Sequence, residues 1–371
     1  MTRLRDSRGI ALPIAIFALV IIGALVAGAF FIGFQEQRVG RNTIKSQQAF
    51  AAAEAGAEAQ VAAWVPGNMN SMAVGSTTAF AGTLTGSNGW YRGGVTRLNG
   101  QLFLVRSEGF DSDSTARHQV GLLLRLKPIE IDIKAALTTQ GSIKVGGSSF
   151  LDGNDHIPTG WSGCDSLAPL PGIRTPDTTQ ITVSGGSLTD YVAGSPVVEQ
   201  DPTITSTTLT TFGDATFADL AAMATMTIGS GPYSGMAASL NADGTCNTTD
   251  ANNWGDPYTS GPCSTYFPII YAPSDTKLTG GYGQGVLVVA GNLTVSGGAE
   301  FFGPVIVQGS VTSTGTGGHF NGGLIAANVD FDSQKLLGNA VVSYSSCALL
   351  RALSNTAPAA LLQERSWVDL Y

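Results

Sequence analysis

Three neighbouring residues in this 371-residue chain have types that could support catalysis. Asp152, Asp155 and His156 lie together in LDGNDHIP, and a pair of carboxylates could cleave a polysaccharide by general acid and base catalysis. The same residues are also typical of an Asp-Gly turn between strands, which is the interpretation we favour. The chain has only 3 histidines, no GxSxG nucleophile elbow and no phosphate-binding Gly-Lys-Ser/Thr loop. The sequence therefore predicts a protein that is not an enzyme.

The four cysteines, Cys164, Cys246, Cys263 and Cys347, include no CxxC pair and have no histidine at zinc-ligand spacing. We therefore expect no metal site there, and an even number in an exported chain favours disulfides. Three pairings are open. Cys246 with Cys263 closes a short loop of turn-forming residues, and Cys164 with Cys347 then follows by elimination. Buried free thiols are the alternative.

Acidic and aromatic residues gather around the Cys246–Cys263 segment, where they could bind a sugar or calcium. The candidates are Asp243, Asp250, Trp254, Asp256 and Tyr258. A stabilised surface loop would explain the same composition. Calcium could also bind an acidic turn in the DSDST segment, although such turns are usually only solvated. The sequence predicts no other cofactor.

Composition limits the classes of partner. Charged residues make up 12% of the chain, its net charge is −8, and glycine occurs 48 times. No cluster of lysine and arginine follows Lys45, so the chain lacks what is needed to bind a nucleic acid backbone. Low charge with many β-branched residues indicates a mainly-β protein.

Residues Ile10 to Phe34 form 25 consecutive positions without a charge. As a helix they would be about 37 Å long, enough to cross a bilayer with some tilt. Arg3, Arg5 and Arg8 precede this run, so the positive-inside rule places the amino end in the cytoplasm and the remaining chain outside. A cleaved secretory signal has a shorter apolar core, whereas an unprocessed signal anchor is an open alternative.

The residues on either side of this run resemble a known family. Gly9-Ile10 before the run looks like the leader of type IV prepilins, and QEQRVGRNTIKSQQAFAAAEAGAEAQ after it is similar to the N-terminal segment of PilX-type minor pilins. The resemblance covers residues 8–60 and implies that a prepilin peptidase cuts between Gly9 and Ile10. In the second motif it is carried by Glu36, Gly40, Asn42, Ala49, Phe50, Ala52, Ala53, Glu54 and Ala55.

One position departs from the pilin pattern. Major pilins carry a glutamate at the fifth mature position, which is Ile14 here. Without that carboxylate the helix buries no unpaired charge in lipid, but it loses the usual docking partner. The resemblance therefore implies a minor pilin at a filament tip or initiating complex. Its implied partners are other pilins and minor pilins, the inner-membrane assembly platform, the prepilin peptidase, membrane lipid and a surface or glycan ligand.

Beyond the apolar run, we expect the helix to continue to Val65 and to end at Pro66-Gly67. Pro13 falls in its first turn, where a missing N–H has no cost. The apolar pattern in the second half is Val39, Ile44, Phe50, Val61 and Trp64. Residues 90–126 then predict a three-stranded antiparallel sheet laid on the helix, with a two-residue hairpin turn at Asn99-Gly100.

Near the C-terminus VLVVAGNLTV, VIVQGSVTS and LIAANVDF repeat with a period of 18 residues. This period suits one coil of a triangular β-solenoid, and a β-sandwich with chance spacing is the alternative. The runs AALTTQGSIKVGGSSFLDGNDH and ITVSGGSLTDYV are expected to be irregular coils of the same stack, and residues 215–225 to be its one helical stretch. The equivalent columns are Val288, Ile306, Leu324 and Val342; Gly291, Gly309 and Ala327; Leu293, Val311 and Val329, followed by Cys347; and Phe302 with Phe320.

The predicted fold class is α+β. Residues 1–9 are the leader, 10–65 the transmembrane and amphipathic helix, 66–127 a small pilin-like sheet, and 128–371 a Gly/Thr-rich mainly-β domain with repeats at 285–347. We expect a single-pass inner-membrane protein whose head is periplasmic or extracellular on a pilus. A membrane-tethered β-solenoid carbohydrate-active enzyme and a secretion-system pseudopilin are the alternatives.

Overall fold

A computed structural model describes residues 11–370 apart from residues 71, 85, 87, 128, 214, 333–339, 358 and 363–366. The chain divides into two compact units. The first comprises Met1–Ala63, Val74–Leu124 and Leu361–Tyr371, and the second comprises Trp64–Ala73 and Arg125–Ala360. Because the chain leaves the first unit and returns to it twice, the second unit consists of two segments inserted into the first, the larger being Arg125–Ala360.

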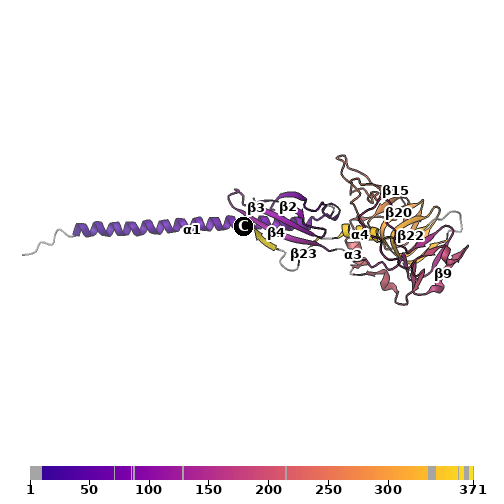
Figure 1. The fold of residues 1–371 in the computed structure, drawn as a ribbon. Coiled ribbons are helices and arrows are strands. Elements are labelled where there is room, and N and C mark those ends of the chain that lie inside the picture. Colours follow the sequence, from indigo (N-terminus) through magenta and orange to yellow (C-terminus); the bar gives the residue numbers. More distant parts are fainter. Residues whose placement is uncertain are drawn as a thin grey trace, which may run out of the picture. The chain divides into compact units, whose positions relative to one another are not determined.

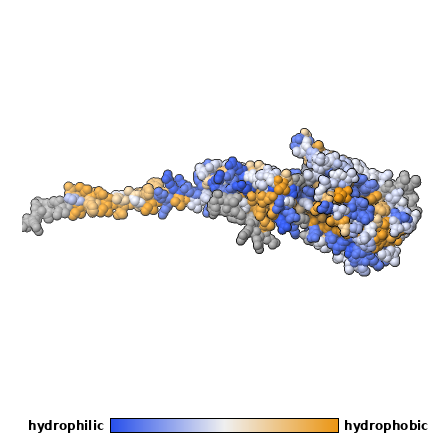
Figure 2. Space-filling view, in the orientation of Figure 1, coloured by the Kyte–Doolittle hydropathy of each residue, from blue (hydrophilic) through white to orange (hydrophobic). Residues whose placement is uncertain are grey.

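The first unit begins with α1 (Ala11–Ala62), a helix of 52 residues (Figure 1). Its side chains from Leu12 to Phe34 are exposed, and its most apolar window has a mean hydropathy of 2.8. Figure 2 shows apolar surface along this first half and polar surface beyond it. By length and composition α1 could cross a membrane. The predicted long apolar helix is confirmed, although α1 ends at Ala62 rather than Val65.

An antiparallel sheet follows α1, and it is larger than the three strands predicted. Its described strands are β1 (Thr77–Thr83), β2 (Trp90–Arg97), β3 (Leu102–Phe110), β4 (Arg117–Leu126), β23 (Ala359–Leu361) and β24 (Trp367–Leu370). They run in the order β1-β2-β3-β4-β23, and β24 also pairs with β4. The last strand of the chain therefore joins the sheet formed by its first strands.

The connection between β2 and β3 differs from the predicted two-residue turn. Arg97 lies opposite Phe103, which leaves a longer loop between the strands. Within it, the Asn99 side chain accepts hydrogen bonds from the backbone N–H groups of Gln101 and Leu102, each at 2.9 Å. This local bonding of an asparagine side chain stabilises the longer loop.

The second half of α1 packs on the sheet through small residues. Ala49, Ala52, Ala53 and Ala57 are buried, and spacings of three and four place them on one face of the helix. A Cβ added to Gly109 of β3 would lie 2.2 Å from the backbone oxygen of Ala49. The helix and strand backbones are therefore in direct contact. Of the apolar pattern in this half, Val39 and Ile44 are exposed, whereas Phe50 is partly buried.

The second unit is mainly β, with short helices between its strands (Figure 1). Its helical elements are α2 (Pro66–Met69), η1 (Thr178–Gln180), η2 (Leu188–Asp190), η3 (Ser206–Leu209), α3 (Phe217–Ala222) and α4 (Ser346–Thr356). Its further strands are β5 (Leu137–Thr139), β6 (Ile143–Gly146), β7 (Phe150–Asp152), β8 (Ile173–Thr175), β9 (Ile181–Ser184), β10 (Val192–Ala193), β11 (Val198–Gln200), β12 (Thr211–Phe212), β13 (Ala215–Thr216), β14 (Met226–Thr227), β15 (Tyr233–Met236), β16 (Ile269–Ala272), β17 (Thr276–Gln284), β18 (Val286–Val289), β19 (Leu293–Ser296), β20 (Ala299–Ser313), β21 (Gly318–Phe331) and β22 (Val341–Tyr344).

Most of these strands form one parallel sheet whose order departs from chain order. One path through it runs β14-β16-β18-β20-β21-β5-β8-β11, with every neighbour parallel. Strands from β14 to β21 thus add in one direction, and the earlier segment from β5 to β11 continues on the far side of β21. The strands of the two earlier runs, β5, β6 and β7 and then β9 and β10, all lie in this parallel sheet.

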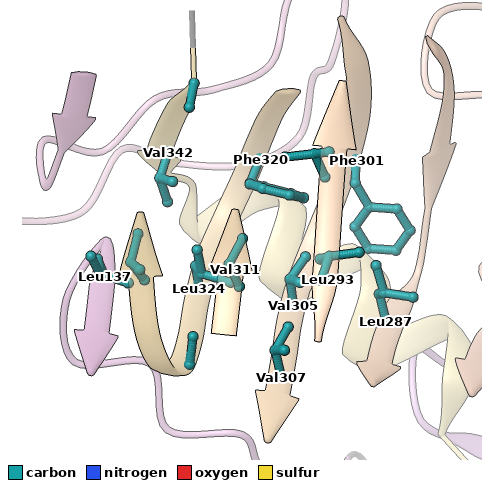
Figure 3. Close-up of a cluster of buried hydrophobic side chains, with 14 of the residues drawn as sticks. Leu137, Leu287, Leu293, Phe301, Val305, Val307, Val311, Phe320, Leu324 and Val342 are labelled. Carbon is teal, nitrogen blue, oxygen red and sulfur yellow. The ribbon is translucent and has the colours of Figure 1, made fainter. Parts of the chain in front are cut away.

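Three rows of aligned side chains build the core of this sheet. They are buried apart from Ile181, which is partly buried, and Figure 3 shows ten of the core residues by name. Each fully buried apolar side chain of this size stabilises the fold by roughly 1.5–3 kcal/mol. The rows are Leu287, Val305, Leu324, Leu137 and Ile173; Leu293, Val311, Val329, Ile143 and Ile181; and Phe301, Phe320, Val342, Leu151 and Val192.

The predicted repeat columns are confirmed in part. Leu293, Val311 and Val329 are in register, as are Val288 and Ile306. Other positions were wrong: Ile306 faces Ile325, Phe320 faces Phe301, Val342 faces Phe320, and Cys347 lies in α4 instead of continuing a column. In the glycine column, the backbone N–H of Gly309 donates to the carbonyl oxygen of Gly291 at 3.1 Å. An irregularity between Val307 and Ser310, where the pairing of β20 with β21 shifts register, accounts for the mismatches at Ile306 and Phe320.

A second core covers the outer side of part of the parallel sheet. Val288, Ile306 and Ile325 form its row on the sheet, and the covering residues include Phe217 and Leu220 of α3. α3 lies within the predicted helical stretch. α4 was not predicted, so the expectation of one helical stretch in this domain was wrong.

Candidate functional site

The residues predicted for assembly occupy two different environments on α1. Gly9 and Ile10 lie outside the described residues, so the processing site stays a prediction. The first environment is solvent-exposed, and Ile14 there has an exposed fraction of 60%. The same exposed surface carries Pro13, Glu36, Gly40 and Asn42.

Phe50 and Glu54 belong to the second environment, where α1 meets the sheet. Both are partly buried. The Phe50 ring lies edge-on to the His118 ring of β4, with 5.0 Å between centroids. The structure therefore separates an exposed apolar half of the helix from a half that is fixed to the sheet.

The acidic turn considered for calcium is occupied by protein donors. The Asp111 carboxylate is buried and accepts the backbone N–H groups of Thr115 and Ala116 at 2.6 and 2.7 Å, and the Thr115 hydroxyl at 2.9 Å. Lys45 of α1 lies 3.1 Å from the carboxylate of Asp113 and 3.6 Å from that of Asp111. A lysine ammonium thus stands beside the turn where a cation would bind, and it joins α1 to the β3–β4 connection.

The structure contains both disulfides in the pairing favoured from the sequence. Cys246 is bonded to Cys263 and Cys164 to Cys347. The second bridge attaches a loop to α4, and the Arg351 guanidinium of that helix lies 4.4 Å from the ring centroid of Trp161. Cation–π contact and disulfide therefore hold the same loop.

The loop closed by Cys246 and Cys263 does not present the predicted ligand side chains together. Trp254 is fully buried and packs against Phe301 in the core, so its predicted role as a surface contact was wrong. Tyr258 is 50% exposed. Its ring contacts those of Tyr282 and Phe302 edge-on.

The three aspartates of that loop region serve the local backbone. Asp243 accepts the N–H and hydroxyl of Thr245, Asp250 accepts the N–H of Asn252, and Asp256 accepts the N–H of Tyr258. These bonds form turns of the kind that aspartate favours, and they lower the pKa of Asp243 and Asp250. The loop is thus a braced structure whose carboxylates are committed to it.

The Asp152, Asp155 and His156 cluster is also committed to the fold. His156 Nε2 lies 2.7 Å from Asp152 Oδ2, and Asp152 Oδ1 accepts the backbone N–H of Asn154 at 2.9 Å. Asp155 accepts the backbone N–H and hydroxyl of Ser346, at the start of α4, at 2.8 and 2.6 Å. A carboxylate at that position stabilises a helix N-terminus. Asp155 therefore holds α4 rather than facing a substrate.

A polar pocket that the sequence did not predict lies over the outer side of β5 and β8. Its volume is about 240 Å³. Its lining includes Thr138, Arg174, Lys134 and several threonines of residues 203–211. The run TITSTTLTTF was the signal available in the sequence, since seven hydroxyl side chains in ten residues are unusual for a covering segment.

Comparison with known proteins gives little further information. No protein-family model matches the chain, and no curated protein matches it. Among solved structures, the competence-associated pilin ComZ from Thermus thermophilus is similar over 88% of this chain and 97% of that chain, with 15% identity and a TM-score of 0.24. A TM-score of this size does not establish a common fold. What the structure itself establishes is a long apolar helix, an antiparallel sheet packed on its second half, and a large mainly-β unit with a parallel sheet and two disulfides.

Proposed function

We propose that this chain is a minor pilin of the PilX type, a low-copy subunit of a type IV pilus. The division of α1 into two halves carries the proposal. Residues 12–34 are apolar and exposed, whereas Ala49, Ala52, Ala53 and Ala57 bury the second half against the sheet. An apolar helix with no cover of its own can lie in a membrane and then pack against helices of other pilins.

The first half of α1 supports a position at the tip or in the initiating complex. Ile14 stands where a bulk filament subunit carries a glutamate, so this helix brings no carboxylate to the amino terminus of a neighbour. A subunit that lacks this docking group starts or ends a filament more readily than it repeats within one. The inserted β unit would crowd a repeating array, which points the same way.

The second unit is the proposed head for adhesion or subunit contacts. Its three aligned rows of core residues support a short β-solenoid-like stack, closed by neighbouring segments that are distant in the chain. Two disulfides fit an oxidising space outside the cytoplasm. The amino end of α1 would then face the cytoplasm, where the prepilin peptidase and the assembly platform act.

The proposal is tested by the mass of the mature amino terminus. We expect cleavage between Gly9 and Ile10 in cells that contain a prepilin peptidase, and the full-length chain in cells without it. Replacing Gly9→Asn should block cleavage in the first strain. An intact Met1, or a cut after the apolar run, would show that α1 is an ordinary anchor or signal.

A second measurement separates a pilus subunit from a secretion pseudopilin. Sheared surface filaments should contain the processed chain in small amounts, and its deletion should reduce the number of pili. A secretion defect with normal pili would assign the chain to a pseudopilus instead.

A further inference from the structure

On the outer side of the parallel sheet, the side chains change from apolar to polar at β5. Val288, Ile306 and Ile325 continue one row there and are buried by the second core. The next positions in the same row are Thr138 of β5 and Arg174 of β8. The segment of residues 203–212 therefore covers a part of the sheet whose outward side chains are polar. The polar pocket of about 240 Å³ lies between this segment and the sheet.

Thr138 is the most informative residue of this pocket. Its exposed fraction is 4%, and its side chain lines the pocket. A hydroxyl in this place can donate and accept a hydrogen bond, so it can serve a ligand that carries hydroxyl groups.

Arg174 supplies donors in the same place. Its guanidinium pairs with Asp201, its Nε lies 3.5 Å from Glu199 Oε2, and this buried Nε makes no hydrogen bond within the described chain. Arginine has five N–H donors, so the pair with Asp201 leaves others for the pocket.

The charged side chains that line the pocket are those of Asp132, Lys134 and Arg174. Lys134 lies 3.0 Å from Asp132, and Arg174 pairs with Asp201. Each cation of the lining therefore already has a carboxylate partner, with which an anionic ligand would have to compete. A neutral ligand with many hydroxyl groups would find both donors and acceptors.

The segment over the sheet adds hydroxyl and apolar surface. Thr207, Thr208 and Thr211 line the pocket with hydroxyl-bearing side chains, while Ile204 and Phe212 line it with apolar ones. Sugar rings present hydroxyls at their edge and C–H groups on their faces. A volume of about 240 Å³ is below the usual size of sites for drug-sized ligands, roughly 300–1,000 Å³.

We propose that this pocket binds one neutral pyranose ring, as found in an uncharged surface glycan. The ring's hydroxyls bond to Thr138, Arg174 and Asp132, and a C–H face packs against Phe212. This inference deepens the proposed head function and rests on it. It moves the contact site from the loop closed by Cys246 and Cys263 to the outer side of β5 and β8.

The test uses the full chain in detergent and ligand-observed NMR. The probes are the methyl glycosides of glucose, galactose, mannose and N-acetylglucosamine at millimolar concentration, with methyl glucuronoside as an anionic comparator. At least one neutral glycoside should bind, and more tightly than the glucuronoside. Thr138→Val should weaken that binding about fivefold to tenfold, as expected for one lost hydrogen bond.

Two further variants make the result unambiguous. Thr138→Val keeps the shape of the side chain, so the melting temperature should change little and a loss of binding can be assigned to the hydroxyl. Should that variant fail to fold, Thr211→Val, on the covering segment, supplies the same comparison. Thr312→Val on β20 is the matched control outside the pocket and should leave binding unchanged.

The proposal is overturned when no neutral glycoside binds, when the glucuronoside binds more tightly, or when Thr138→Val and Thr312→Val weaken binding equally. These outcomes leave the pilin proposal standing, since processing at Gly9-Ile10 and recovery in sheared filaments are measured separately. Conversely, unprocessed protein that still binds the glycoside through Thr138 would overturn the pilin proposal alone.

Discussion

Asp111 organises the turn between β3 and β4 through its carboxylate. The backbone N–H of Ala116, the donors of Thr115 and the charge of Lys45 stabilise its ionised form, and together they lower its pKa below the ordinary 3.8. Because the native pKa lies below the unfolded one, the contribution of Asp111 is fully present at neutral pH. It is lost as pH falls from about 3.8 through the native value.

We expect Asp111→Asn to lower the melting temperature at neutral pH by several degrees. In the variant an amide NH₂ replaces one carboxylate oxygen. That NH₂ is a donor, so it cannot accept a hydrogen bond from the N–H and hydroxyl groups around it. The difference in melting temperature between the variant and the parent should shrink as pH falls below about 3.8, because Asp111 of the parent then also loses its charge. Thermal unfolding of the two chains at neutral and acid pH measures this, and Asp113→Asn is the control at an exposed carboxylate. A deficit that stays constant with pH would contradict the charge argument.

The type of a residue does not determine whether its side chain is buried or which partner it contacts. The two disulfides were predictable because an even number of cysteines left few pairings. Trp254 was misplaced because an aromatic beside acids suits both a surface loop and a core anchor, and only the packing against Phe301 distinguishes them. Asp155 likewise could not be assigned to the N-terminus of α4 while α4 itself was unrecognised.

At the scale of elements, the close contact of α1 with β3 depends on Gly109 of β3, which has no side chain. Gly109→Ala should destabilise the first unit by about 1–3 kcal/mol, because the new Cβ would meet the backbone of Ala49 and Ala53 at 2.2 Å. Gly100→Ala is the matched control, since nothing lies within 4 Å of its added Cβ. Denaturant unfolding measures both. Equal effects would mean that α1 and β3 are not in backbone contact.

The two disulfides should differ in their contribution to stability. The bridge between Cys164 and Cys347 spans a separation of 183 residues and that between Cys246 and Cys263 spans 17. In the chain-entropy description, replacing the long-range pair by serine should cost about 2 kcal/mol more than replacing the short-range pair. Chemical unfolding of the two double variants tests this. A larger loss from the short-range pair would show that native-state contacts of the loop, rather than chain entropy, dominate.

Element prediction succeeded where the pattern was long and failed where one residue changed the register. The apolar run gave α1, and the 18-residue repeat gave the aligned row of Leu293, Val311 and Val329. The columns through Ile306 and Phe320 failed because the irregularity after Val307 places one additional residue in β20, which composition does not mark. The hairpin at Asn99 failed because its side chain bonds to the following backbone and lengthens the loop.

At the scale of the whole molecule, the antiparallel sheet is completed from the far end of the chain. β24 pairs with β4, with Trp367 opposite Leu122 and Leu370 opposite Gln119. A chain that ends at Leu362 should therefore show faster amide exchange in residues 119–122 of β4. The pairing of β1 with β2 supplies the control, because its exchange should not change. Unchanged exchange in β4 would mean that β24 adds no protection.

Chain order gave no means of predicting how the parallel sheet is assembled. The repeats near the C-terminus were visible because they are adjacent in sequence. The position of β5 beside β21 was not, because only the match of Leu137 to Leu324 across a long separation specifies it. The polar pocket lies between segments joined in this way, which is why no local motif indicated it.

The insertion of the second unit has a mechanical consequence. Tension applied between the end of β4 and the start of α4 would run through the bond between Cys164 and Cys347. The residues between these two cysteines lie outside that path, so they add no length while the bond is intact. Only the stretch from the end of β4 to Cys164 would lengthen, by at most roughly 130 Å of extended chain at 3.3–3.6 Å per residue. Under such tension the chain between these two points would therefore extend by a short, fixed amount.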